Sequence, residues 1–193
     1  MSPDFSTARR FDQPFPSWRA EGVIEPVLAS AALEWLERDA PWRLRQTDFY
    51  EQHEFSLLDA SLPDSLSALA SAQFVACVGK GLGDALGASA LALVEVAAHR
   101  LTAGQTIRLH NDYLENGEET HRLLIQLNRG WQANFGGYLM LFESDQPESV
   151  TELLLPVHRG AFGFEISPRS FHAVSTINAG QRHTLVYTFR RTQ

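Results

Sequence analysis

Residues 158–189 read HRGAFGFEISPRSFHAVSTINAGQRHTLVYTF, a stretch with three short runs rich in aromatic and β-branched residues. The runs GAFGFEI, FHAVSTI and HTLVYTF are separated by Ser, Pro, Asn and Gly, which favour turns. Similar runs precede them from Leu91 onward: LALVEVAA, TIRLH, RLLIQLN, GGYLMLF and TELLLPV. Eight short strands with little room for helices between them predict a mainly β fold, an antiparallel jelly roll or barrel.

The first 89 residues have the spacing of amphipathic helices behind a proline-rich lead. One helix is expected before Pro41, with its apolar face formed by Val27, Leu28, Ala31, Ala32, Trp35 and Leu36. A second is expected from about Pro63, with a stripe of Leu66, Leu69, Ala70, Phe74 and Cys77 and an end weakened by glycines. We therefore expect a single domain over residues 1–193, in which a helical part, 1–89, packs on a β core, 90–193.

The composition is that of an ordinary soluble protein, with 44% hydrophobic and 20% charged residues among 193. No apolar run approaches the length of a membrane span, and MSPDFSTARRFDQPFPSW lacks the apolar core of a secretory signal. A cytoplasmic protein without a membrane partner is expected. The net charge of −7 gives no overall attraction for nucleic acid, so none is expected as a partner. The oligomeric state is left open.

The single cysteine, Cys77, excludes an internal disulfide and a thiolate metal site. A metal would thus be held by histidine and carboxylate. His110 and Asp112 stand two apart at the end of TIRLH, where strand alternation would direct both side chains to one face. His172 begins a later strand, FHAVSTI, which a jelly roll can bring beside the first.

Two imidazoles and one carboxylate form the facial triad that holds non-haem Fe(II) and leaves coordination positions open. A structural zinc site with these residues is the alternative, but such sites usually close with four protein ligands. The five remaining histidines have no comparable partners and are expected in surface or packing roles: His53, His99, His121, His158 and His183.

Arg182 follows the last metal candidate by ten positions and alternates with Thr184 onto one face of the terminal strand. A buried guanidinium without a protein carboxylate invites a carboxylate from a ligand. We expect these two residues to bind an anionic co-substrate.

The segments HNDY, RLLIQLNRGW, GGYLMLF, LLPVHRGAFGFE and FHAVSTINAGQRHTLVYTF together resemble the prolyl-hydroxylase-like branch of the Fe(II)/2-oxoglutarate-dependent dioxygenases. The resemblance covers about 100 residues, and PFPSW is similar to the lead of the same branch. It implies a double-stranded β-helix with iron at His110, Asp112 and His172. It also implies 2-oxoglutarate as co-substrate, bound through its distal carboxylate by Arg182 with help from Thr184, and leaves ascorbate open as a reductant.

Two positions depart from the family pattern. Relatives often carry a tyrosine shortly before the first iron ligand and another in the strand with the Leu-Asn dipeptide, where this chain has HRLTAG and LLIQLN. Gln126 is the candidate replacement for a tyrosine hydroxyl at the co-substrate, and Arg122 is a second candidate on the same face. Both could equally be polar residues satisfied by the backbone. Halogenating relatives lack the carboxylate ligand, so Asp112 argues against halogenation.

These residues predict an enzyme that hydroxylates an unactivated C–H bond of an amino acid, peptide or related small molecule and releases succinate and CO2. No catalytic residue is required beyond the metal ligands. The loops TDFYEQHEF and YLENGEETH would select the substrate, and their glutamates favour a cationic one. Two alternatives stay open: desaturation, cyclisation or epimerisation on the same fold, and a non-catalytic β-barrel module that binds a metal or ligand.

Overall fold

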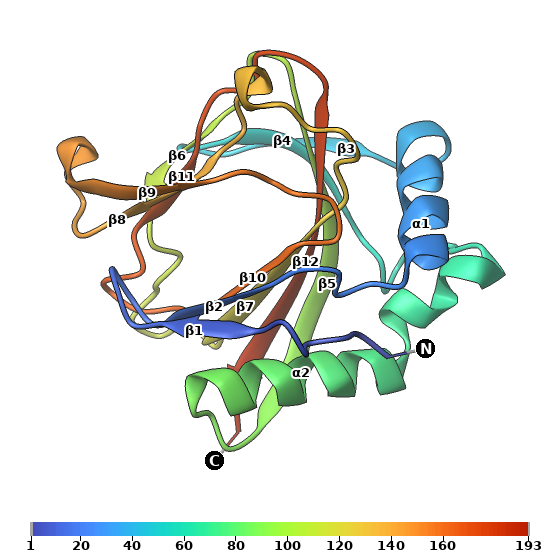
Figure 1. The fold of residues 1–193 in the computed structure, drawn as a ribbon, viewed down its shortest axis with the longest axis horizontal. Helices are drawn as coiled ribbons and strands as arrows, with labels where there is room; N and C mark the ends of the chain where they lie inside the picture. Colours follow the sequence, from blue (N-terminus) through green and yellow to red (C-terminus); the bar gives the residue numbers. More distant parts are fainter. Residues whose placement is uncertain (1, 193) are drawn as a thin grey trace.

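The computed structural model describes residues 2–192, whose strands form two antiparallel sheets (Figure 1). The strands are β1 Arg9–Phe11, β2 Ser17–Ala20, β3 Arg43–Gln46, β4 Glu51–Ser56, β5 Leu91–Thr102, β6 Ile107–His110, β7 His121–Gln126, β8 Leu139–Phe142, β9 Val150–Leu154, β10 Ala161–Glu165, β11 His172–Val174 and β12 Gln181–Arg191. The large sheet has the order β1-β2-β10-β7-β12-β5-β4-β3, and the small sheet has the order β6-β11-β8-β9. This is the double-stranded β-helix, or jelly roll, that the sequence predicted, and all eight strands expected after Leu91 are present.

The expectation that the first 89 residues are helical was incomplete, because they also contribute four strands. β1 and β2 extend the large sheet beyond β10, while β3 and β4 extend it beyond β5. β1 and β3 are exposed edge strands with the sequences RRF and RLRQ. Edge strands of this kind need no apolar alternation, so their pattern does not distinguish them from loops.

The first helix, α1, spans Pro26–Arg38 and begins where the Glu25 carboxylate accepts hydrogen bonds from two backbone amides of the first turn. Proline at its first position suits a helix start, because the missing amide would have no helical partner there. Its buried face is Leu28, Ala29, Ala32, Leu33 and Leu36. Val27 was expected on this face but is 70% exposed, so the assignment of Val27 was wrong.

The second predicted helix is divided into a 3-10 helix, η1 at Asp64–Ala70, and an α-helix, α2 at Ala72–Leu86. Ser71 interrupts it with an extended backbone, and its hydroxyl caps α2 by accepting a hydrogen bond from the Phe74 amide. The helix continues through its glycines and ends at Gly87, whose φ of 77° is the left-handed cap conformation. Cys77, expected on the apolar stripe, is only half-buried.

The segment Asp64–Leu86 is long and apolar enough to cross a membrane by length and composition alone, with a mean hydropathy of 1.2. The segment is interrupted at Ser71, however, and its apolar residues are explained by their burial in the protein core. Phe74, Val78 and Leu82 are at most 1% exposed, in the core between α2 and the large sheet.

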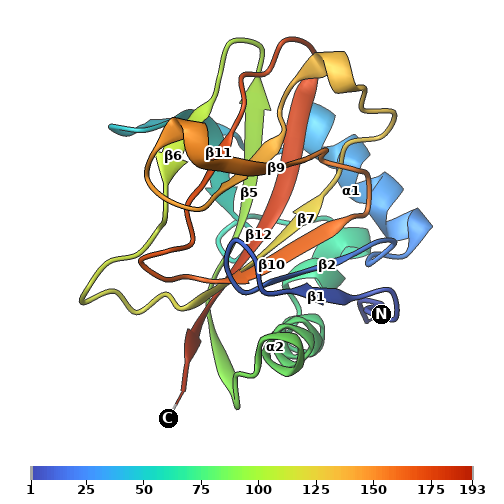
Figure 2. The same ribbon diagram turned by 60° about the vertical axis from the view of Figure 1, so that its left-hand side comes forward.

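The large sheet separates this helical layer from an internal cavity, and strand alternation decides which side chains face which side. On β12, Leu185, Tyr187 and Phe189 point to the core under the helices. The intervening Thr184, Val186 and Thr188 line the cavity between the two sheets. Figures 1 and 2 show the small sheet facing the large one across this space, with the helices on the outer side.

Candidate functional site

The three predicted metal ligands line one cavity and meet there. His110 ends β6, His172 begins the neighbouring β11, and the two are direct partners in the small sheet. Their ligand atoms and the Asp112 carboxylate lie within 4.8 Å of one another. The structure therefore brings together the residues that the sequence proposed as a metal site.

Asp112 reaches this point by a different route from the one expected. It lies beyond the end of β6, and its φ of 58° is left-handed, so a turn rather than strand alternation directs its carboxylate. Asn111 fixes that turn: its side-chain oxygen accepts from the Tyr113 amide, and its side-chain amide donates to the Pro168 carbonyl. Such asparagine-centred turns are a common way to hold a tight local bend.

Both histidine rings are held with one nitrogen directed inward. Nδ1 of His110 lies 2.7 Å from the Arg108 carbonyl oxygen, and Nδ1 of His172 lies 2.7 Å from that of Ser170. A carbonyl accepts only, so each Nδ1 carries the proton and each Nε2 presents a lone pair. These lone pairs face the Asp112 oxygens at 3.5 and 3.3 Å. Lone pairs converging in this way repel one another unless a cation lies between them, so the residues fit a divalent metal.

The electrostatics keep His110 and Asp112 in their ligand forms. Burial lowers the pKa of His110 to about 4, and the neighbouring His172 acts in the same direction. Burial alone would raise the pKa of Asp112, but the Arg122 guanidinium and His172 hold it well below its usual range. At neutral pH the site therefore offers a neutral His110 imidazole and an ionised carboxylate, which are the forms that bind a metal.

Arg122 takes a place that the sequence did not predict. It lies on β7 with its side chain in the cavity, and its Nη1 is 2.7 Å from Asp112 Oδ2. Its Nη2 pairs with Glu119. The Arg122 guanidinium thus contacts the carboxylate of Asp112, a metal-ligand candidate. It does not contact Arg182, beside which it was a candidate to bind the co-substrate.

Arg182 and Thr184 do share one face of β12, as expected. Arg182 is 4% exposed, and its Nη1 donates to the Thr184 hydroxyl at 3.0 Å. Its Nε and Nη2 are buried without a hydrogen-bond partner among the described residues. Burial lowers the pKa of Arg182 to about 10, so it is still a cation at neutral pH. A buried cation with free donors is costly, and an anionic ligand would satisfy it.

Gln126 stands behind this pair. Its side-chain oxygen accepts a hydrogen bond of 3.0 Å from the Thr184 hydroxyl and a longer one from Asn128. The Thr184 hydroxyl therefore accepts a hydrogen bond from Arg182 and donates one to Gln126. Gln126 therefore orients Thr184 and is not among the residues lining the cavity.

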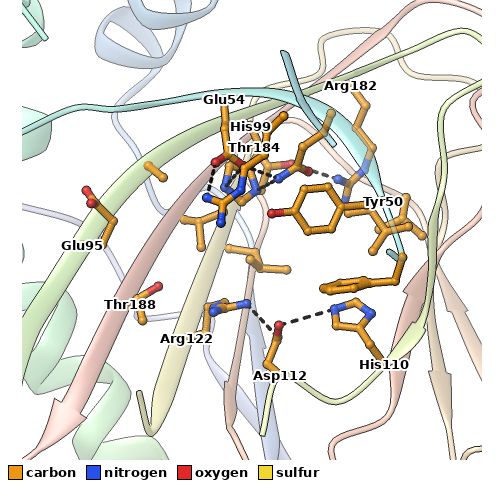
Figure 3. Close-up of a pocket in the computed structure, with 18 of the residues that line it drawn as sticks. Tyr50, Glu54, Glu95, His99, His110, Asp112, Arg122, Arg182, Thr184 and Thr188 are labelled. Atoms are coloured by element: carbon orange, nitrogen blue, oxygen red, sulfur yellow. Dashed lines mark hydrogen bonds and ion pairs between the residues drawn. The ribbon is translucent and has the colours of Figure 1, made fainter. Parts of the chain in front are cut away.

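The cavity has a volume of about 670 Å³, and the three ligand candidates form part of its wall. Figure 3 shows Arg182, Thr184, His99 and Tyr50 at one end and Glu95 and Thr188 at the other. Such a volume accommodates a small ligand and part of a second.

His99, expected in a surface or packing role, lines this cavity. Its Nε2 lies 3.9 Å from the Glu54 carboxylate, and burial lowers its pKa to about 4. Tyr50 belongs to the loop TDFYEQHEF that the sequence assigned to substrate selection, and it lines the cavity from just before β4. The alternation of Ala97 and His99 with buried Val96 and Ala98 was the available signal for His99.

Solved structures share this architecture. A Pseudomonas putida prolyl-4-hydroxylase aligns with a TM-score of 0.70 and 19% identity over 92% of this chain and 93% of its own. A Trichoplax adhaerens prolyl hydroxylase in complex with a hypoxia-inducible-factor peptide gives 0.73 and 14% over 91% and 83%. The viral collagen prolyl hydroxylase of Paramecium bursaria Chlorella virus 1, complexed with 2-oxoglutarate, gives 0.68 and 11% over 91% and 96%.

The fold is the double-stranded β-helix that these prolyl hydroxylases share, and it carries an open His-Asp-His group that could hold a metal ion. The model of the 2OG-Fe(II) oxygenase superfamily matches residues 96–189, which include all three ligand candidates and Arg182. The match covers the segment that carries the candidate site, and members of that superfamily use Fe(II) and 2-oxoglutarate. An oxygenase of this kind also requires O2 and a substrate. Ascorbate, by contrast, stays a prediction from the sequence.

Proposed function

We propose that this protein is an Fe(II)- and 2-oxoglutarate-dependent hydroxylase of an unactivated C–H bond in an amino acid, peptide or related small molecule. The observation that carries the proposal is an open metal triad in the same cavity as a buried arginine with unsatisfied donors. Metal sites of this composition with open positions belong to oxygen-activating enzymes, and the arginine fits the carboxylate of a co-substrate.

His110, Asp112 and His172 would hold Fe(II). The metal and 2-oxoglutarate would supply the oxidising power, with one atom of O2 entering succinate and the other the product hydroxyl while CO2 is released. In this scheme no protein group needs to act as acid or base. The chain's own task is to bind, orient and keep out water.

Several side chains in and behind the cavity then have a definite task. Arg182 and the Thr184 hydroxyl would bind the distal carboxylate of 2-oxoglutarate, with Gln126 fixing the threonine. Arg122 holds the Asp112 carboxylate in place and keeps it ionised. Tyr50, just before β4, and His99, on β5, would enclose the co-substrate.

An amino acid or peptide is supported as substrate by the volume of the cavity beyond the co-substrate end. The Trichoplax relative was solved with a peptide. The loop after Asp112 borders the site through Glu119 and exposes Tyr113 and Leu114. Loops at such a position select substrates, because they vary without disturbing the core.

Turnover with a panel of amino acids and short peptides tests the proposal, read by succinate formation and product mass. A substrate that stimulates succinate release and gains one oxygen atom supports hydroxylation. A product that loses two hydrogens, or keeps its mass, would instead indicate desaturation, cyclisation or epimerisation. A protein that never converts 2-oxoglutarate to succinate would be a binding module, and the proposal would be wrong.

A further inference from the structure

The inner face of the large sheet carries two polar rows across the strands. In the first, Thr184 on β12 is opposite Gln126 on β7 and His99 on β5. In the second, Thr188 is opposite Arg122 on β7 and Glu95 on β5. Four residues of a strand separate the rows, which corresponds to about 13 Å. Only the first row contacts Arg182, so the second lies in a different part of the same cavity.

An apolar band fills the interval between the rows. Val186 is opposite Leu124 and Ala97, and all three line the cavity. The backbone of Glu95 is two strands away from the backbone of Arg122, which is roughly 10 Å at ordinary strand spacing. Since Arg122 contacts Asp112, an aliphatic chain of a few carbons would span from Glu95 to the metal group.

The charged residues lining the cavity form ion pairs, apart from exposed Arg43 and two inward residues, Arg182 and Glu95. Arg45 pairs with Glu54, and Arg122 pairs with Asp112 and Glu119. Arg182 is left for the co-substrate, and Arg43 is exposed on edge strand β3. Glu95 has no arginine, lysine or histidine within ion-pair distance among residues 2–192.

The hydrogen bonds of Glu95 use one side of its carboxylate. Oε1 accepts from the Ser56 hydroxyl and from the Val96 amide, each at 2.8 Å. These two contacts hold the group in place and leave Oε2 for another donor. Thr188, 4% exposed, adds a hydroxyl beside it. The arrangement is a fixed anion at one end of an apolar passage.

We propose that Glu95 anchors the cationic end of the substrate, an ammonium or guanidinium group on an aliphatic chain, as in a basic amino acid or a basic side chain of a peptide. The inference rests on the proposed hydroxylase function and names its substrate class. The cation would pair with Glu95 Oε2, the chain would lie along Ala97, Val186 and Leu124, and a carbon several bonds away would approach the metal group. Glu95 is thus a substrate-positioning residue with no part in the oxidation itself.

Binding of simple probes tests the anchor directly. Pentan-1-amine and its neutral counterpart 1-pentanol are titrated by calorimetry into the anaerobic Fe(II) protein with 2-oxoglutarate. We expect the amine to bind at least about tenfold more tightly than the alcohol, since a charge-assisted pair in a half-buried site contributes this much. Glu95→Gln should remove the preference and leave alcohol binding unchanged. Equal affinities for the two probes in the wild-type protein would overturn the inference.

Two further variants separate the anchor from general charge. Glu115→Gln removes an acid from the exposed loop outside the cavity and should keep the amine preference in full. Glu95→Asp keeps the charge but withdraws it by one methylene, so the preferred chain should lengthen from pentan-1-amine to hexan-1-amine. This variant decides the question if Glu95→Gln does not fold. Loss of the preference in Glu115→Gln, or no shift in Glu95→Asp, would contradict the assignment.

Turnover distinguishes a free basic amino acid from a basic side chain of a peptide. It also separates the proposed substrate class from the proposed hydroxylase function. L-lysine, L-ornithine and L-arginine are compared with L-norleucine, and a lysine-containing peptide with its norleucine counterpart. We expect succinate release with the basic member of either the free or the peptide set. If neither set is converted or bound while 2-oxoglutarate still binds, the substrate class is wrong and the hydroxylase proposal stands. If 2-oxoglutarate does not bind either, both fail.

Discussion

At the scale of single residues, His172 connects fold and site, because it is a strand residue of the small sheet and also a ligand candidate. It is 6% exposed, and its ring is fixed through Nδ1 by the Ser170 carbonyl. It packs against the rings of His110 and Phe164. A test of its metal-binding role must therefore also check that the fold survives the loss of the ring.

His172→Ala should lose stoichiometric Fe(II) binding, because two ligands no longer define a facial site. The small sheet should still fold, since the backbone pairing of β11 does not need the imidazole. Metal analysis after anaerobic loading measures the first effect, and circular dichroism the second. His158→Ala, which removes a histidine outside the metal group, serves as control. Iron retained at one equivalent in His172→Ala would remove this residue from the site.

Arg182→Gln should raise the 2-oxoglutarate requirement strongly. A desolvated, charge-assisted contact contributes about 2–4 kcal/mol, which corresponds to roughly 30- to 1,000-fold in affinity. Arg190→Gln on the same strand removes an exposed charge paired with Glu118 and should have no such effect. The dependence of succinate formation on 2-oxoglutarate concentration is the measurement. An unchanged requirement in Arg182→Gln would place the co-substrate elsewhere.

The sequence predicted that His110, Asp112 and His172 lie close together, because each is at or next to the end of a recognisable strand. It gave the wrong geometry for Asp112, because the left-handed φ of 58° depends on contacts that the preceding residue, Asn111, makes with Pro168 and Ser170 far along the chain. The role of Arg122 was equally invisible. Alternation placed it on the correct face, but its pairing with Asp112 depends on how the two sheets are spaced.

At the scale of elements, Ser71 decides how the segment between Asp64 and Leu86 is divided. Its side chain caps α2 and donates to the Ala68 carbonyl at the end of η1. The change of direction at this point lets Leu69 reach the core, where its carbonyl also accepts from the Tyr187 hydroxyl. A continuous helix was expected because apolar spacing alone does not record the break.

Ser71→Ala should reduce the free energy of unfolding by about 1 kcal/mol, the usual contribution of an N-cap side chain. Chemical denaturation monitored by circular dichroism measures this loss. Ser65→Ala, at an exposed position of η1, should change the stability little. Equal stability of the Ser71 variant and the wild type would mean that packing alone fixes the start of α2.

The eight strands after Leu91 could be predicted since each has an apolar run and a turn signal on either side. β1 and β3 could not, because exposed edge strands are defined by the partner they pair with. β4 was read as a loop for a related reason. Its sequence EQHEFS has little apolar alternation, yet its side chains Gln52 and Glu54 face the cavity, where polar residues are required.

At the scale of the whole molecule, buried neutral histidines link stability to pH. His121 and His183 are at most 1% exposed, and burial lowers the pKa of each to about 4. Both stay neutral in the folded protein, while the unfolded chain takes up protons below about pH 6.5. Their contribution to stability is therefore complete above that pH and is lost as the pH falls toward 4.

The free energy of unfolding should fall by about 2 kcal/mol for each of these histidines between pH 7 and pH 5. Most carboxylates titrate at lower pH, so this window isolates the histidines. Denaturant titrations at several pH values give the curve, and His183→Gln should reduce its slope. A stability that is constant from pH 7 to pH 5 would show that the rings are protonated or solvated in the folded state.

The proposed function depends on one ferrous site and one arginine that the two sheets bring into the same cavity. The most direct test is an anaerobic titration of the Fe(II) protein with 2-oxoglutarate, followed by visible absorption. We predict a metal-to-ligand charge-transfer band that saturates at one equivalent in the wild type. The band should be absent in His172→Ala and need far more 2-oxoglutarate in Arg182→Gln. A wild-type protein that binds Fe(II) yet develops no band at any 2-oxoglutarate concentration would contradict the account.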